Sequence, residues 1–164
     1  MRTIIIAVFG LLCAARPTLA EAPTIAIRLA AREPNGKAGQ AMVVRVTTVN
    51  ESDHPISYEN TSPYCNYRFK VLTAAGAPAP QSDLQQRMTD CSGGHLPPGG
   101  VWVPGTTGRD IFVTLKPGES GSEDLNIAEV YDLSQPGNYT VQVDRTFPGI
   151  GHFTSNVITV TVTP

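Results

Sequence analysis

Three histidines carry much of the chemistry that the mature part of this sequence could offer. His54, His95 and His152 are too far apart to form the His-Glu-x-x-His pattern of a zinc peptidase. His95 and His152 lie with Asp90 in predicted loops, so a transition-metal site assembled from separate loops is one alternative. Solvated loop histidines are the simpler interpretation. We therefore expect no metal and no cofactor.

Two serines stand in runs that partly resemble nucleophile motifs. Cys91 interrupts the protease-like pattern around Ser92, and a catalytic triad also needs a His and an Asp in the right geometry. Ser120 lies in Gly-Glu-Ser-Gly-Ser, where a nucleophile elbow requires a fifth-position Gly instead of Ser122. The sequence therefore predicts no catalytic residue and a protein that is not an enzyme.

Acidic residues are frequent between the last predicted strands, where carboxylates could hold Ca²⁺. They do not follow the alternating Asp or Asn spacing of a calcium loop, so a solvated acidic face is the preferred interpretation. The residues are Glu119, Glu123, Asp124, Glu129 and Asp132.

The first twenty residues have the form of a secretory signal peptide. Arg2 precedes an apolar run over residues 4–12, and Thr18-Leu19-Ala20 offers a small-x-small cleavage site before Glu21. The apolar run is far shorter than the roughly 20 residues that span a bilayer. We expect residues 1–20 to be removed, and residues 21–164 to form one secreted or periplasmic domain without membrane insertion.

The cysteines of the mature chain agree with export. Cys13 leaves with the signal, so Cys65 and Cys91 remain as an even pair in an oxidising compartment. We expect a disulfide between them. The mature chain is also acidic and has no cluster of Lys or Arg, which argues against nucleic acid as a partner.

Short stretches of alternating apolar and polar residues, separated by Gly and Pro turns, run through the mature chain. This pattern is typical of half-buried antiparallel strands, and no stripe of helical period competes with it. It predicts an all-β, immunoglobulin-like antiparallel sandwich of about seven strands. The stretches lie at 25–29, 44–47, 56–58, 67–71, 111–115, 125–127, 139–144 and 158–162, with a turn at Pro34-Asn35-Gly36.

The most specific local signal is a Gly-Asn-Tyr step at the start of the penultimate strand. It places Tyr139 where sandwich domains carry a tyrosine corner, whose hydroxyl bonds to upstream backbone. An ordinary strand aromatic is the alternative. In either case the role of Tyr139 is structural.

One stretch, at about 73–109, is not needed by the sandwich. It is rich in Pro and Gly, and loops of this length in compact domains are usually functional or disordered. We place a candidate binding loop at 74–108, with His95 and Trp102 as its candidate contact residues and Cys91 as its tether. Packing of Trp102 against the sandwich is the alternative to a binding role.

The segments 115–120, 131–133 and 137–141, with 155–160, resemble the β-rich N-terminal region of deuterolysin-type secreted metallopeptidases. The likeness also extends to small exported bacterial proteins made of this domain alone. It is clear over residues 110–164 and faint before them. The resemblance implies the fold and no activity, because the zinc motif of the catalytic domain is absent.

A small exported sandwich without catalytic groups is expected to be a binding or accessory module. Its partner would be a protein or a glycan. A protease inhibitor that presents a disulfide-tethered loop is the first alternative. A loop-assembled metal-binding protein or enzyme is the second.

Overall fold

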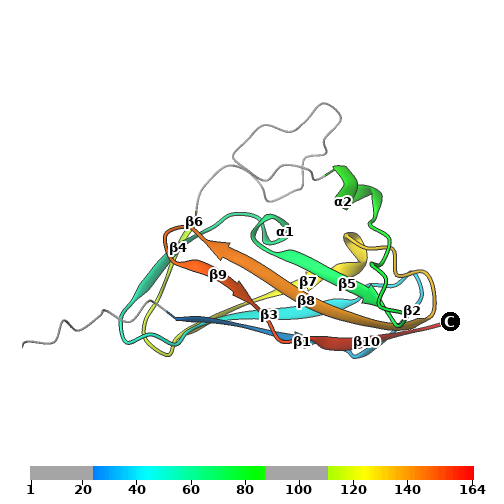
Figure 1. Ribbon diagram of the computed structural model, residues 1–164, viewed down its shortest axis with the longest axis horizontal. Helices are drawn as coiled ribbons and strands as arrows, with labels where there is room; N and C mark the ends of the chain where they lie inside the picture. The colour runs from blue at the N-terminus through cyan, green and yellow to red at the C-terminus, as the bar shows by residue number, and fades with distance from the viewer. Residues whose placement is uncertain (1–23, 88–110) are drawn as a thin grey trace, which may run out of the picture.

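The structure, a computed structural model, describes residues 24–87 and 111–164 (Figure 1). Most of the described residues lie in strands, and the helical segments are short. No helix in these two ranges is long and apolar enough to cross a membrane. The strands are β1 (Ile25–Ala31), β2 (Asn35–Lys37), β3 (Val43–Asn50), β4 (Ile56–Asn60), β5 (Arg68–Thr73), β6 (Ile111–Leu115), β7 (Ser120–Asn126), β8 (Gly137–Phe147), β9 (Gly151–Thr154) and β10 (Ile158–Thr163). The helical segments are α1 (Pro63–Asn66), α2 (Asp83–Arg87) and the 3₁₀ turn η1 (Ile127–Glu129).

The strands form an immunoglobulin-like antiparallel sandwich, as the sequence predicts. One sheet has the order β1-β3-β7, and the other has the order β2-β10-β8-β5 with β9 paired to β8. A two-stranded ladder, β4-β6, completes the described part. Every pair is antiparallel except β2 with β10.

The core lies between the two sheets because each strand alternates buried and exposed residues. On β3 every second residue, from Val44 to Asn50, is buried, and on β8 every second residue from Tyr139 to Phe147 is buried. Most of these are Val or aromatic residues, which pack well on a pleated surface. Arg145 is an exception on the inward face of β8, and its contacts are described below.

The alternating stretches expected from the sequence overlap eight of the strands, although the stretch at 125–127 runs past the end of β7 and the one at 67–71 begins before β5. Two further strands, β2 and β9, carry no such signal. The Pro34-Asn35-Gly36 stretch is not a simple turn, because Asn35–Lys37 forms β2 and pairs in parallel with the end of β10. β9 pairs with the end of β8 across a turn at Gly149, where φ is +75°. Ile127, expected in a strand, is fully buried at the start of η1.

The first part of the long stretch after β5 is packed against the sandwich. Gly76, at φ +77°, turns the chain back so that Ala79 N–H bonds to the Val71 carbonyl at 2.9 Å. Ala79 is buried, and an isolated bridge then joins Gln81 to Tyr131. Residues 77–79 are therefore held along the outer edge of β5, and residues 80–82 are held against the segment 129–132. Residues 88–110 lie outside the described residues.

Candidate functional site

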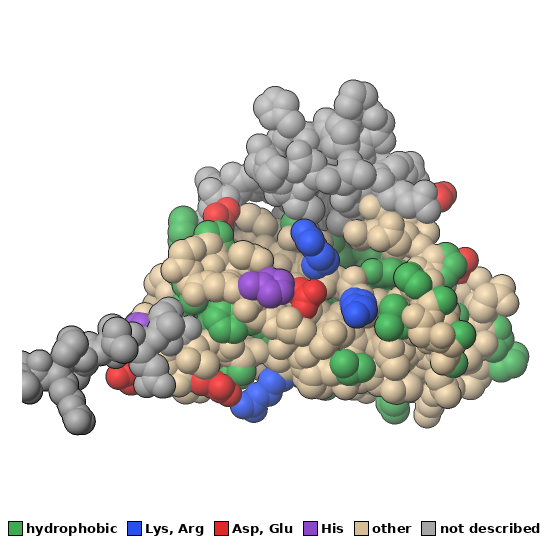
Figure 2. Space-filling model, in the orientation of Figure 1, with side chains coloured by type: hydrophobic (Ala, Val, Ile, Leu, Met, Phe, Trp, Pro, Cys, Tyr) green, Lys and Arg blue, Asp and Glu red, His purple; other side chains and the backbone are tan. Residues whose placement is uncertain are grey.

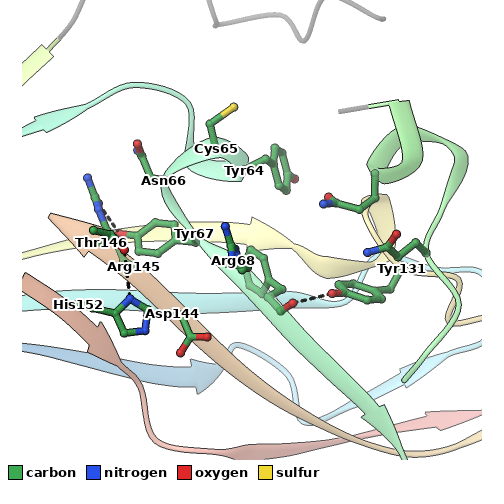
Figure 3. A pocket seen from close by; sticks show the side chains of 13 residues that line it. Tyr64, Cys65, Asn66, Tyr67, Arg68, Tyr131, Asp144, Arg145, Thr146 and His152 are labelled. Carbon is green, nitrogen blue, oxygen red and sulfur yellow. Dashed lines mark hydrogen bonds between the residues drawn. The ribbon is translucent and has the colours of Figure 1, made fainter. Parts of the chain in front are cut away.

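A groove of about 540 Å³ runs along the β5 edge of the larger sheet (Figure 3). Its floor is formed by the start of β5 and the end of β8. Its walls are α1 on one side and the segment after Ala79 on the other. Its lining includes the side chains of Tyr64, Arg68, Gln85, Asp144 and His152.

The α1 wall is held by hydrogen bonds of its backbone and of the Tyr64 side chain. Ser62 accepts hydrogen bonds at its carbonyl from the N–H groups of Cys65 and Asn66, both at 2.9 Å, and Pro63 suits the first helical position because it needs no donor there. The Tyr64 hydroxyl donates to Glu129 Oε2 at 2.6 Å. Burial, followed by this bond to a carboxylate, raises the pKa of Tyr64 well above its ordinary value.

The opposite wall is fixed by backbone contacts to the segment around η1. Ser82 N–H bonds to the Val130 carbonyl at 3.0 Å, and the Ser82 hydroxyl donates to the Glu129 carbonyl at 2.6 Å. The same hydroxyl accepts the Gln85 N–H at 3.2 Å and so starts α2. Both walls are therefore preformed, as ligand sites usually are.

Beneath the groove floor lies a buried arginine surrounded by aromatic rings. Arg145 is 4% exposed, and its guanidinium carbon lies 4.5 Å from the Phe147 ring centroid, with the Tyr58 and Tyr67 centroids at 4.9 and 5.0 Å. It donates to the Tyr67 hydroxyl at 3.2 Å and to the Glu59 carbonyl at 2.9 Å. Ring faces and neutral oxygens thus replace the hydration of this charge.

Asn60 connects Arg145 to a second buried polar group. Its Oδ1 accepts from Arg145 at 3.2 Å, while its Nδ2 donates to Glu123 Oε1 at 2.7 Å. Glu123 Oε2 is buried and has no hydrogen-bond partner among the described residues. Burial raises the pKa of Tyr67, and the nearby Glu123 charge raises it further. The cluster fixes the floor of the groove from below.

Several polar groups on the floor have hydrogen-bonding capacity that no other described residue uses. Arg68 stands opposite Asp144 in the β5–β8 register, yet within the described ranges its guanidinium forms no ion pair or hydrogen bond. One Asp144 oxygen accepts from Thr154 at 2.8 Å. His152 uses Nδ1 for Thr146 Oγ1 at 3.1 Å, which leaves Nε2. Figure 2 shows basic, acidic and histidine side chains close together on this face of the molecule.

The structure brings two of the residues singled out from the sequence to this groove. Cys65, the first half of the predicted disulfide, lies on α1, and His152 lies on β9. Cys91, His95 and Trp102 lie outside the described residues, so the predicted disulfide and binding loop remain predictions. The inhibitor and loop-assembled metal-site alternatives depend on the same segment.

The other predicted chemistry is distributed over the molecule. His54 lies between β3 and β4, where its Nδ1 contacts Asp53 at 2.8 Å. The acidic residues each have separate contacts: Asp124 with Arg45 at 2.8 Å, for example, and Glu119 with the Lys116 N–H at 2.8 Å. The part of the chain that the structure describes contains no group of three or more His, Cys, Asp or Glu side chains able to hold a metal.

Tyr139 lies away from the groove, on the buried face of β8. Its hydroxyl donates to the Gln135 carbonyl at 2.8 Å, four residues upstream. This contact is the one that a tyrosine corner makes. It supports the predicted structural role, which a substitution can test.

Most groove residues gave no signal in the sequence. Arg68 and Asp144 occupy the polar positions of ordinary alternating strands, and Gln85 lies in a stretch that the sequence predicts to be a loop. Their proximity depends on the pairing of β5 with β8 and on the return of the chain after Gly76. The one available hint was Cys65, because a cysteine pair marks where a loop is tied to the sandwich.

Comparisons with known proteins give little beyond the fold. No family model matches the chain, and no curated protein matches it. Among solved structures, the chain is similar to the CARDB domain of the PF1109 protein of Pyrococcus furiosus, which was solved in complex with di-metal ions. That match has 11% identity and a TM-score of 0.41, and it covers 88% of this chain and 97% of the other. A likeness at this level carries no argument about function. None of these findings supports a relation to deuterolysin-type peptidases, so only the β-sandwich part of that resemblance is retained.

Proposed function

We propose that this protein is a non-catalytic, exported binding module that holds its ligand in the groove beside β5. The observation that carries this proposal is a preformed concave surface with unused polar groups. Both walls are fixed by short hydrogen bonds, while Arg68 on the floor has no partner within the described residues. Little ordering is then required when a ligand binds, which favours affinity.

A substitution series tests whether the groove is the binding surface. Arg68→Ala and Gln85→Ala remove one exposed and one half-buried polar group from the groove, and neither residue belongs to the core. Lys70→Ala is the matched control, because Lys70 lies two residues along the same exposed face of β5 but does not line the groove. The mature protein and its variants would be probed on arrays of exported proteins and glycans.

We expect signals of the wild-type protein to be lost in both groove variants and kept in Lys70→Ala. Trp102→Ala, in the predicted binding loop, is included to separate the two candidate surfaces. Signals that depend on Trp102 and are unaffected by either groove variant would place binding in the loop and contradict the groove.

Export is part of the same proposal and has its own support in the N-terminal pattern. The basic Arg2, the short apolar run and the small residues before Glu21 are those of a cleavable signal. N-terminal sequencing of protein recovered outside the cytoplasm should begin at Glu21. Recovery of the uncleaved chain in the cytoplasm would contradict export.

A further inference from the structure

We infer that the ligand of this groove is a neutral oligosaccharide segment. The inference rests on the proposed binding function and adds the chemical class of the ligand. Three features of the groove lead to it: the balance of its charges, the state of its tyrosine hydroxyls and the closed edge of β5.

The first feature is a polar floor whose exposed charges balance, since Arg145, which also contributes to the lining, is buried and bonded to the Tyr67 hydroxyl and the Glu59 carbonyl. Arg68 and Asp144 face each other across the β5–β8 register as one basic and one acidic group, and Gln85 adds an amide from the wall. Guanidinium groups donate, carboxylates accept and amides do both. A sugar hydroxyl also donates and accepts, so it can use all three. A strongly anionic ligand would meet Asp144, and a cationic one would meet Arg68.

The second feature concerns the tyrosines of the lining. Their hydroxyls are bonded within the protein, so a ligand would contact their rings. The Tyr64 hydroxyl is bonded to Glu129 at 2.6 Å, and the Tyr131 hydroxyl is bonded to the Phe69 carbonyl at 2.6 Å (Figure 3). Tyr64 is partly exposed, so its ring offers apolar surface beside the polar floor. A pyranose has the same combination of an apolar C–H face and a polar rim, and rigid aromatic rings bury such a face at small entropic cost.

The third feature separates a glycan from an extended peptide. A peptide that adds a strand needs a row of unpaired backbone groups at a sheet edge. Along β5 that edge is occupied, because Thr73 and Ala79 N–H bonds join residues 77–79 to it at 2.8 and 2.9 Å. Tyr131 takes the Phe69 carbonyl further along. A ligand in the groove would therefore meet mainly side chains and few free backbone groups of β5.

Affinity gel electrophoresis of the mature protein tests the inference directly. The probes are soluble neutral polysaccharides, namely laminarin, galactomannan, xyloglucan and hydroxyethyl cellulose, with polygalacturonate and heparin as charged comparisons. We expect retardation by at least one neutral polysaccharide. Raising the NaCl concentration should not weaken it, because screening acts on charge pairs.

Matched variants link retardation to the groove. Arg68→Ala and Gln85→Ala should each weaken binding about tenfold, the effect of one lost hydrogen bond. Tyr64→Ala should abolish it. Tyr64→Phe keeps the ring but loses the bond to Glu129 that holds the α1 wall, so it should weaken binding without abolishing it. Lys70→Ala should be unchanged, and circular dichroism would verify that each variant is folded.

Two results would overturn the inference. One is that no neutral polysaccharide retards the protein, or that only the charged ones do. The other is retardation that persists in the Tyr64→Ala and Arg68→Ala variants. If the array experiment then finds a protein ligand that depends on Arg68 and Gln85, the groove remains the binding site and only the glycan assignment fails.

Discussion

At the scale of single residues, the interior of this sandwich contains polar side chains at strand positions where the alternating pattern predicts apolar ones. Arg145 occupies an inward position of β8, where Val141 and Val143 occupy the preceding ones. Its charge is accommodated by three rings and by neutral oxygens, one of them on Asn60. A buried charge persists only where such partners surround it.

Replacing Arg145 should therefore destabilise the fold strongly. Arg145→Ala leaves a cavity and removes the donor from the Glu59 carbonyl, so we expect a loss of about 3 to 5 kcal/mol in the free energy of unfolding. Denaturant titration measures it. Arg28→Ala is the control, because the Arg28–Glu51 pair is exposed and such pairs contribute about 1 kcal/mol or less. Equal effects of the two substitutions would contradict this account of Arg145.

Tyr139→Phe tests the tyrosine corner. The substitution keeps the ring in the core and removes only the donor to the Gln135 carbonyl. We expect a loss of about 0.5 to 1.5 kcal/mol, the net contribution of one hydrogen bond, and unchanged ligand binding. Unchanged stability in denaturant melts would show that the hydroxyl has no structural role.

At the scale of strands and loops, two sheet edges are covered by nearby parts of the chain: a short return segment at one edge and a single side chain at the other. The residues after Gly76 cover the edge of β5. At the edge of β1, the Asn156 side chain accepts from Leu29 N–H at 2.8 Å and donates to the Leu29 carbonyl at 2.9 Å. One amide thus replaces a neighbouring strand at this position. Uncovered edges invite pairing between molecules.

Asn156→Ala should uncover the edge of β1. Both backbone groups of the buried Leu29 would lose their partner, so we expect a loss of about 1 to 3 kcal/mol and a greater tendency to associate. Melting curves and light scattering at increasing concentration measure the two effects. In the control Asn138→Ala, the amide removed is exposed and, within residues 24–87 and 111–164, bonds only to the Thr161 side chain. If Asn156→Ala resembles that control, the edge contact is not significant.

The predicted pair Cys65 and Cys91 belongs to the same scale, because it would tie a segment to the α1 wall of the groove. The prediction rests on an even number of cysteines in an exported chain. Thiol labelling of denatured, unreduced mature protein should find no free thiol. Two labelled cysteines would disprove the pair.

At the scale of the whole molecule, four tyrosines share one electrostatic property. Burial is the largest cause of a raised pKa in each, because it disfavours the charged phenolate. They lie in the core and along the groove, at Tyr58, Tyr64, Tyr67 and Tyr131. The folded protein therefore holds these protons more firmly than the unfolded chain does.

This difference predicts instability in alkali. The stabilising contribution is complete below the pKa of an unfolded tyrosine, about 10, and is lost as the pH rises above it, because the unfolded chain then releases protons that the folded protein keeps. Denaturant midpoints should be similar at about pH 8 and pH 9 and should fall at about pH 11. Phenolate absorbance should rise together with unfolding. A midpoint that stays constant up to pH 11 would contradict the buried state of these hydroxyls.

The sandwich was predictable because a half-buried strand alternates apolar and polar residues, and this alternation is visible in the sequence. That signal locates β1, β3, β5, β8 and β10 and gives the inward direction of Tyr139. It fails for β2 and β9, which are short and have few apolar residues. Such strands form because a longer neighbour, β10 or β8, offers them a partner.

The sequence by itself determined the fold class, the turn glycines and the polar character of the outward strand faces, because these depend on local pattern. Only the tertiary structure decided which polar residues meet. Pairing of β5 with β8 places Arg68 opposite Asp144, and β9 adds His152 beside them. Alternation along β8 turns Arg145 inward, and the tertiary structure brings the rings of Tyr58, from β4, and Tyr67 against it. Contacts between residues about 75 or more positions apart depend on strand register, and no local pattern records that register.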